Sequence, residues 1–69
     1  MNVTVNGRLS ELPARATVER AVEASGAQSS QPGLAVAVDG EIVPRSQWTA
    51  RELTDGQRVE VLRAVGGGA

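Results

Sequence analysis

Three two-residue turn signals most constrain how this 69-residue chain can fold. Asn6-Gly7, Asp39-Gly40 and Asp55-Gly56 each pair a residue that tolerates positive φ with a glycine, the composition favoured in tight turns between strands. Each turn lies next to a short segment in which apolar residues alternate with polar ones or follow one another. The chain is therefore predicted to turn back on itself several times and to form a sheet of short strands.

The first 13 residues predict a β-hairpin. Met1, Val3 and Val5 alternate with polar residues, and this period of two gives a strand one apolar and one polar face. A return strand is expected over residues 9–12. Pro13 ends it, because proline cannot donate a hydrogen bond to a strand ladder.

A short helix is predicted after the hairpin. Thr17 is the expected N-cap, Val18 and Val22 form an apolar stripe at helical spacing, and Gly26 is the expected C-terminal stop. Residues 27–33 are expected to form a loop. A helix of about two turns is not stable alone, so we expect it to lie across a sheet that receives its valines.

The second half predicts three further strands and a short excursion. Residues 34–38 are apolar on both faces, which favours an interior position in a sheet. A strand over 41–43 is expected to end at Pro44, a helical turn is expected over 49–53, and the last strand is expected over 57–65. Successive residues of that last strand face opposite sides of the sheet. Val59 and Val61 are therefore expected on one face, and Glu60, Leu62 and Ala64 on the other.

Few side chains in this sequence could carry chemistry. Without cysteine or histidine it has no thiol nucleophile, and it lacks the usual general base and the usual zinc ligands. Glu19 and Glu23 are four residues apart on the predicted helix, and we interpret them as a solvated face rather than an acid–base pair. Trp48, the one aromatic residue, is interpreted as a structural plug rather than a ligand-stacking residue. No catalytic residue and no metal ligand is therefore expected.

Size and charge exclude further function classes. A chain of this length buries only about 60% of its unfolded surface, which makes an enclosed active-site cavity unexpected. The net charge is −1 and the seven basic residues, all arginine, are scattered, so nucleic acid is not an expected partner. The sequence shows no apolar run of membrane-spanning length and no signal-peptide pattern, so we expect a soluble, cytoplasmic protein without a membrane partner.

The C-terminal segment Val65-Gly66-Gly67-Gly68-Ala69 is predicted to be mobile, because glycine has no side chain to pack and much backbone entropy to lose. A glycine thread can enter a narrow enzyme channel, and the four residues after Val65 could reach ~13 Å. Taken alone, the segment is also consistent with a frayed end or a cloning remnant.

The predicted order is strand, strand, helix, strand, short strand, turn, strand. One helix on one face of a mixed sheet of about five strands is an α+β arrangement of the β-grasp or ubiquitin-like type. Within this order, Ile42-Val43-Pro44-Arg45 with Trp48, then Asp55-Gly56 and a strand running into Gly67-Gly68, closely resembles the ThiS family of sulfur carriers of thiamin biosynthesis. The resemblance covers essentially the whole chain. We therefore expect a β-grasp sulfur-carrier domain over 1–65 and a flexible glycine tail over 66–69.

The resemblance implies a protein substrate rather than an enzyme. In the family, an E1-like adenylating enzyme uses ATP and magnesium to adenylate the terminal glycine carboxylate. A sulfur donor, such as a cysteine desulfurase, then replaces AMP and leaves a thiocarboxylate that gives its sulfur to thiazole synthase. By alignment Gly67 and Gly68 are the motif glycines, and Gly68 is the residue that accepts AMP and then sulfur. The carrier itself is expected to bind no cofactor.

Residues near the tail are expected to contact these partners. Leu62, Ala64 and Val65 are the expected docking residues, with Ala35 and Ala37 beside them on the sheet face that lacks the helix. Ala69 departs from the family pattern, in which the chain usually ends at the second glycine. It could be removed by a peptidase, which would then be a further partner, or it could be tolerated, or it could be non-native.

Other readings stay open on the sequence alone. Carriers for molybdopterin, cysteine or secondary-metabolite sulfur share the Gly-Gly end, although the chain length fits the thiamin group better than the longer molybdopterin group. A non-covalent ubiquitin-like binding module is a second class, and a small enzyme is a third. Removal of residues 67–69 would abolish a carrier and leave a binding module intact.

Overall fold

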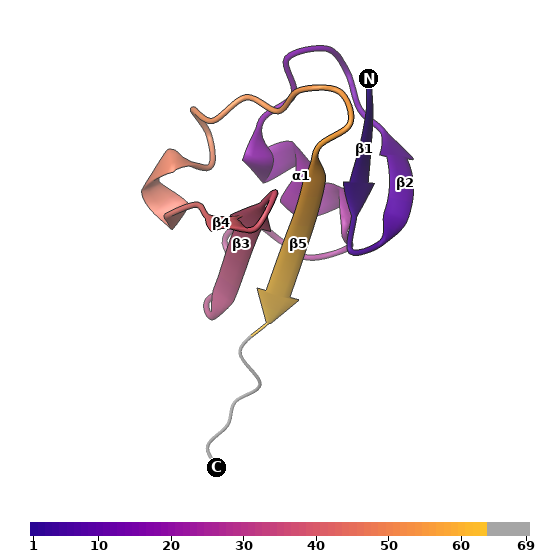
Figure 1. Cartoon of the computed structure of the whole chain (residues 1–69). Helices are drawn as coiled ribbons and strands as arrows, with labels where there is room; N and C mark the ends of the chain where they lie inside the picture. Colours follow the sequence, from indigo (N-terminus) through magenta and orange to yellow (C-terminus); the bar gives the residue numbers. More distant parts are fainter. Residues whose placement is uncertain (64–69) are drawn as a thin grey trace.

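The computed structural model describes residues 1–63 of the chain as a mixed β-sheet with an α-helix across one face (Figure 1). In this part of the chain the sheet has five strands, in the order β2-β1-β5-β3-β4. The strands and the helix are β1 (Asn2–Val5), β2 (Arg8–Glu11), α1 (Val18–Ala24), β3 (Leu34–Val38), β4 (Glu41–Ile42) and β5 (Arg58–Arg63). β5 therefore occupies the centre of the sheet, with β2 and β4 at the edges.

The first and last strands lie side by side. β1 and β5 run parallel, with Thr4 opposite Arg58. On its other side β5 pairs antiparallel with the whole of β3, from Leu34 opposite Arg63 to Val38 opposite Val59. The prediction that residues 34–38 form an interior strand is confirmed, and the last strand, β5, is the central one.

Two of the predicted turns have the backbone that their composition requires. Asn6 and Gly7 have φ of 51° and 80°, and Asp39 and Gly40 have φ of 50° and 84°. Positive φ at both central residues is the mark of a type I′ turn, whose twist matches that of the flanking strands. These turns produce the β1–β2 and β3–β4 hairpins.

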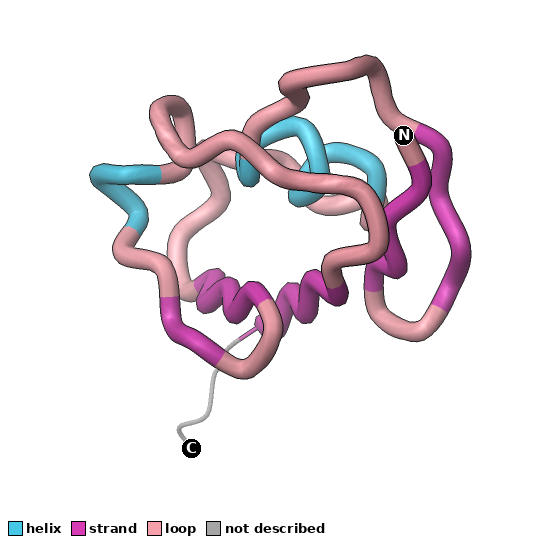
Figure 2. Tube along the Cα trace, turned by 45° about the horizontal axis from the view of Figure 1, so that its top comes forward, coloured by secondary structure: helices cyan, strands magenta, loops and turns pink. Residues whose placement is uncertain are grey.

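The core lies between α1 and the sheet and is built largely from valine. Figure 2 shows α1 spaced from the strands, and the buried side chains fill that space. β-branched valine is well suited to a small sheet core because its χ1 is already restricted in the unfolded chain. The buried residues are Val3, Val5, Leu12, Val18, Ala21, Val22, Val36, Val38, Val43, Trp48, Leu53, Val59 and Val61.

The predicted helical turn over 49–53 is wrong, and the bounds of three strands shift. The turn is a 3-10 turn at Arg45–Gln47, directly after Pro44, whose fixed φ suits the start of such a turn. Glu52 cannot be helical because it forms an isolated antiparallel bridge with Thr17. β2 begins and ends one residue earlier than predicted, β4 ends one residue earlier, and β5 begins one residue later.

Candidate functional site

The candidate site is the C-terminal end of β5 together with the sheet face around it. The sequence places the reactive glycine beyond this strand, and Figure 1 shows β5 ending at the far side of the molecule from the N-terminus. Six of the predicted site residues lie outside the described residues, so their roles stay predictions: Ala64, Val65, Gly66, Gly67, Gly68 and Ala69. Leu62 is the predicted site residue that the structure describes.

Leu62 faces away from α1. Val59 and Val61 on β5 point into the core, so the alternation puts Glu60 and Leu62 on the opposite face of the sheet. The Leu62 side chain is 61% exposed. The predicted position of Leu62 outside the core is confirmed, and its role in docking remains a prediction.

A small apolar patch surrounds Leu62 on the helix-free face. Ala35 lies directly opposite Leu62 on β3, and Ala37 lies opposite both Glu60 on β5 and Ile42 on β4. Residues directly opposite each other in adjacent strands share a face. We call Leu62, Ala35, Ala37 and Ile42 the sheet patch. Sequence reasoning missed Ile42, although the two-residue turn at 39–40 fixes the hairpin register that puts it beside Ala37.

The family-specific segment around Pro44 has a structural role. The indole Nε1 of Trp48, which is 3% exposed, donates to the carbonyl of Val43 at 2.9 Å. The guanidinium of Arg45 lies 4.4 Å from the centre of the Trp48 ring and donates to the carbonyls of Ser29 and Gln31. The prediction of Trp48 as a plug is confirmed, and Arg45 ties the loop between α1 and β3 to this plug.

The same segment caps the first turn of α1. The backbone N–H of Val18 donates to the carbonyl of Arg51 at 2.9 Å, and that of Glu19 donates to the carbonyl of Trp48 at 3.0 Å. Thr17 occupies the N-cap position, as predicted, and has extended dihedrals. In the described structure its side chain makes no capping hydrogen bond. The expected mechanism of capping is therefore wrong, because carbonyls from a distant segment already satisfy these donors.

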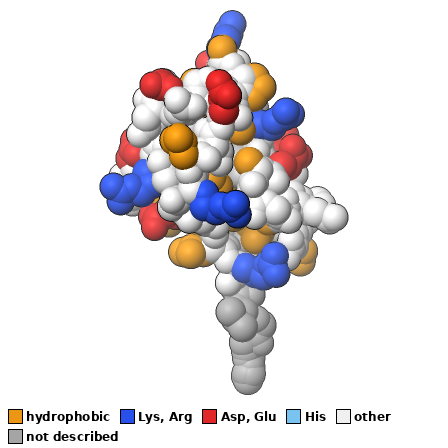
Figure 3. All heavy atoms as spheres, turned by 90° about the vertical axis from the view of Figure 1, so that its right-hand side faces the viewer, with side chains coloured by type: hydrophobic (Ala, Val, Ile, Leu, Met, Phe, Trp, Pro, Cys, Tyr) orange, Lys and Arg blue, Asp and Glu red, His pale blue; other side chains and the backbone are white. Residues whose placement is uncertain are grey.

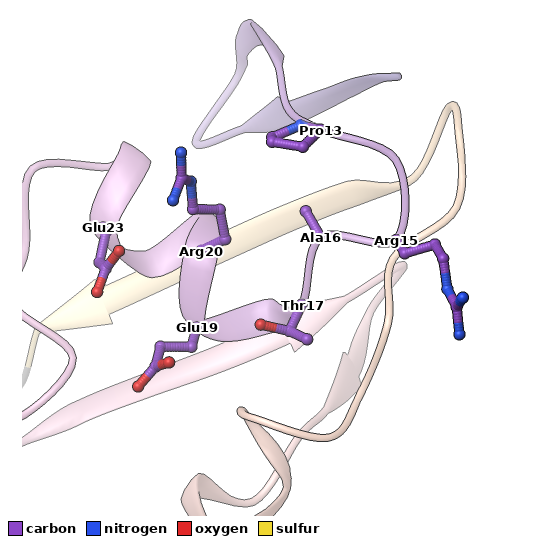
Figure 4. A pocket seen from close by; sticks show the side chains of 7 residues that line it. All are labelled: Pro13, Arg15, Ala16, Thr17, Glu19, Arg20 and Glu23. Atoms are coloured by element: carbon purple, nitrogen blue, oxygen red, sulfur yellow. The ribbon is translucent and has the colours of Figure 1, made fainter.

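An open hollow of about 290 Å³ lies beside the start of α1 (Figure 4). In Figure 4 the carboxylates of Glu19 and Glu23 reach one side of the helix and Arg20 reaches another. Glu19 accepts a hydrogen bond from the hydroxyl of Ser29 at 3.3 Å, and Glu23 is exposed. These environments favour the interpretation of the two carboxylates as a solvated face.

The charges of the described residues form no obvious ligand site. Figure 3 shows arginine and acidic side chains interspersed on the side of the molecule that carries β2. Residues 1–63 contain no cluster of three or more side chains that could hold a metal ion. Over the same residues, no helix is long and apolar enough to cross a lipid bilayer.

The strand order β2-β1-β5-β3-β4, with one helix across one face, defines this molecule as a β-grasp domain of the ubiquitin-like class, as the sequence predicts. The model of the ThiS family matches residues 3–68, and the chain therefore belongs to the ThiS family.

Two solved structures of a thiamine biosynthesis protein from Geobacter metallireducens are similar to this chain. The crystal structure of the protein, named ThiS, is 31% identical with a TM-score of 0.74, over 99% of this chain and 100% of that one. The NMR solution structure is 33% identical with a TM-score of 0.70, over 100% of this chain and 90% of that one. No curated protein sequence matches the chain.

Proposed function

We propose that the protein is a sulfur carrier of thiamin biosynthesis, and that it serves as a protein substrate rather than an enzyme. The observation that carries this proposal is the extent of the family match, which runs from residue 3 through Gly67 and ends at Gly68. The match thus includes the two glycines that the chemistry requires. The full-length similarity to a thiamine biosynthesis protein supports the same role.

The proposed chemistry takes place at the carboxylate of Gly68. An oxygen of this carboxylate attacks the α-phosphate of ATP in an E1-like adenylating enzyme, with magnesium, and pyrophosphate leaves. The persulfide of a donor such as a cysteine desulfurase then attacks the acyl-adenylate and displaces AMP, because AMP is a good leaving group and carboxylate oxygen is a poor one. A thiol reductant cleaves the S–S bond of the resulting acyl disulfide and leaves the thiocarboxylate. The resulting thiocarboxylate gives its sulfur to thiazole synthase. In this scheme the carrier binds no cofactor of its own.

The described domain supplies the docking surface for these steps. The sheet patch carries the exposed side chains of Leu62 and Ile42 and lies next to the end of β5, so a partner that covers it lies close to Arg63, from which the chain continues to Gly68. Burying apolar area favours association, and fully burying a leucine side chain is worth roughly 1.5–3 kcal/mol before the costs of association. We propose that the adenylating enzyme docks on the sheet patch.

Mass spectrometry tests the proposed function. The chain ending at Gly68 is incubated with the adenylating enzyme from the same genome, ATP, magnesium and a sulfur source. We expect it to gain the mass difference between sulfur and oxygen, and a variant lacking Gly67 and Gly68 should gain nothing. An unmodified carrier, under conditions that thiolate the Geobacter protein, would contradict the proposal.

A second incubation tests the pathway. The thiolated carrier is mixed with thiazole synthase and its small-molecule substrates, and we expect the added mass to disappear as thiazole forms. Transfer only to a molybdopterin or cysteine-forming enzyme would assign the carrier to another pathway.

A further inference from the structure

The side chain of Asn6 is hydrogen-bonded to the backbone of β5. Its Oδ1 accepts from the N–H of Val61 at 2.8 Å, and its Nδ2 donates to the carbonyl of the same residue at 3.3 Å. The backbone N–H of Asn6 donates to the carbonyl of Val59 at 2.9 Å. Asn6 thus contacts two alternate residues, Val59 and Val61, on the same edge of β5.

The carboxamide of Asn6 takes the place of a missing stretch of β1. In a regular parallel pair, Val61 would donate to the carbonyl of residue 6 and accept from the N–H of residue 8. The chain instead turns away at Asn6, whose φ is 51°, and enters the β1–β2 hairpin. A side-chain amide carries the same acceptor and donor as a peptide group, so it continues the ladder by one step beyond the end of β1.

This contact lies where β5 continues beyond the end of its pairing with β1. The described pairing of β1 with β5 ends at Val5 opposite Val59, whereas β5 continues to Arg63. Val61 is only 9% exposed, so unpaired backbone groups there would be costly. On its other edge the end of β5 is paired with β3 through Leu34 opposite Arg63. With Asn6 in place, the strand is held on both edges close to the point from which the chain continues to Gly68.

We propose that Asn6 is a positioning residue, whose carboxamide fixes the direction of β5 at its C-terminal end and so directs the chain beyond Arg63 into the adenylating enzyme. The inference rests on the proposed function. Asparagine suits both tasks at this position, because it tolerates positive φ better than most residues and carries a donor and an acceptor together. Glycine would serve the turn equally well but could not hold β5.

Two substitutions of Asn6 separate the turn from the hydrogen bonds. Asn6→Gly keeps the turn and removes both side-chain bonds. Asn6→Asp keeps an oxygen for the N–H of Val61 but places a second oxygen against its carbonyl. Asp39→Gly is a matched control, because Asp39 has φ of 50° in a similar turn and its Oδ1 accepts from the N–H of Arg58 at 2.9 Å, at the start of β5. All variants are compared under conditions in which Trp48 fluorescence reports a folded domain.

Amide hydrogen exchange gives the structural readout. Exchange at the N–H of Val61 should rise roughly ten-fold in Asn6→Gly, as expected for the loss of one hydrogen bond, and less in Asn6→Asp. It should be unchanged in Asp39→Gly. Equal exchange at Val61 in Asn6→Gly and the wild type would overturn the proposal.

Adenylation kinetics give the functional readout, measured as ATP–pyrophosphate exchange with the chain ending at Gly68 or at Ala69, whichever supports exchange in the wild type. The KM for the Asn6→Gly carrier should rise roughly ten-fold with little change in kcat, because the direction of the strand must then be fixed on binding. An unchanged KM, or an equal rise in Asp39→Gly, would reduce Asn6 to a purely structural residue. If the wild-type carrier supports no ATP–pyrophosphate exchange, the result contradicts the proposed function instead. The rate of hydrogen exchange at the Val61 amide then still tests whether Asn6 holds β5.

Discussion

At the scale of single residues, Arg45 shows that a family-specific motif can serve the fold rather than the chemistry. Its guanidinium stacks on the Trp48 ring and donates to two carbonyls of the loop between α1 and β3. Arg45→Lys should lose the stacking and one of these donors, since an ammonium lacks the planar fork of a guanidinium. We expect a loss of about 1 kcal/mol in the free energy of unfolding, measured in urea by Trp48 fluorescence.

The matched control for Arg45 is Arg20→Lys, at an exposed position on α1. This change should alter the free energy of unfolding by less than about 0.5 kcal/mol. Equal losses in both variants would mean that the contacts of Arg45 do not stabilise the loop.

Sequence reasoning identified what Trp48 does but not what Arg45 does. A lone tryptophan in a small domain fills the core because of its size, whatever surrounds it. The partners of Arg45 are carbonyls of Ser29 and Gln31, which are 16 and 14 residues away in sequence. Backbone carbonyls are present at every residue, so the sequence carries no signal for which ones an arginine will meet.

At the scale of elements, α1 shows how a distant segment replaces a local cap. The carbonyls of Trp48 and Arg51 accept from the first turn of α1, so the side chain of Thr17 has little to add. Thr17→Ala should therefore change the free energy of unfolding by less than about 0.5 kcal/mol, compared with the ~1 kcal/mol typical of an N-cap. Urea denaturation followed by Trp48 fluorescence measures it.

The opposite end of α1 provides the contrast for Thr17. The hydroxyl of Ser25 donates to the carbonyl of Val22 at 2.6 Å, so Ser25→Ala should cost about 1 kcal/mol. A loss for Thr17→Ala as large as that for Ser25→Ala would show that Thr17 acts as a conventional cap after all.

The strands were predictable because their pattern is local. The helical turn predicted over 49–53 was wrong, because the conformation of that segment depends on distant residues. Alternation and turn composition fix which residues of a strand face the core. The bridge between Thr17 and Glu52, by contrast, is set by how the chain packs across α1. It makes residue 52 extended in a segment whose composition alone favours a helical turn.

The prediction about docking of the adenylating enzyme concerns Leu62 on β5. Leu62→Glu places a charge in the sheet patch, on a side chain that is 61% exposed, so the domain should stay folded. We expect the affinity for the adenylating enzyme to fall at least roughly ten-fold, since a carboxylate would have to be desolvated on docking. Isothermal titration calorimetry with the adenylating enzyme measures the change.

Leu9→Glu is the control for this prediction. Leu9 on β2 is 75% exposed and lies opposite Thr4, on the same face of the sheet but two strands away from Leu62. Its replacement should leave the affinity nearly unchanged. If both substitutions weaken binding equally, the enzyme covers the whole face, and if neither does, the sheet patch is not the docking surface.

At the scale of the whole molecule, the first and last strands, β1 and β5, are adjacent and parallel. β1 enters the sheet where the turn at 55–56 begins β5, and β5 leaves at the opposite end (Figure 1). The order of elements in the sequence was enough to predict a mixed sheet with one helix on one face. It was not enough to predict how β5 is held at its end, because that depends on the side chain of Asn6 reaching a strand 55 residues away in sequence.

The last prediction concerns the residue after Gly68. We expect a chain that continues with Ala69 to be inactive, and hydrolysis of the Gly68-Ala69 bond to create the working terminus. Adenylation requires a carboxylate oxygen to approach the α-phosphate of ATP in line, and one extra residue displaces the carboxylate by ~3.5 Å, far more than a near-attack geometry tolerates. The alanine methyl group would also have to enter a channel shaped for glycine.

ATP–pyrophosphate exchange with three synthetic forms of the carrier separates these two effects. One form ends at Gly68, one at Ala69, and one carries Ala69→Gly, which keeps the extra residue and removes the methyl group. We expect exchange with the first form alone. Exchange with the Ala69→Gly form as well would make the methyl group the obstacle rather than the displaced carboxylate. Equal exchange with the Ala69 form would show that no cleavage is needed, because the activating site then accepts the carboxylate one residue later.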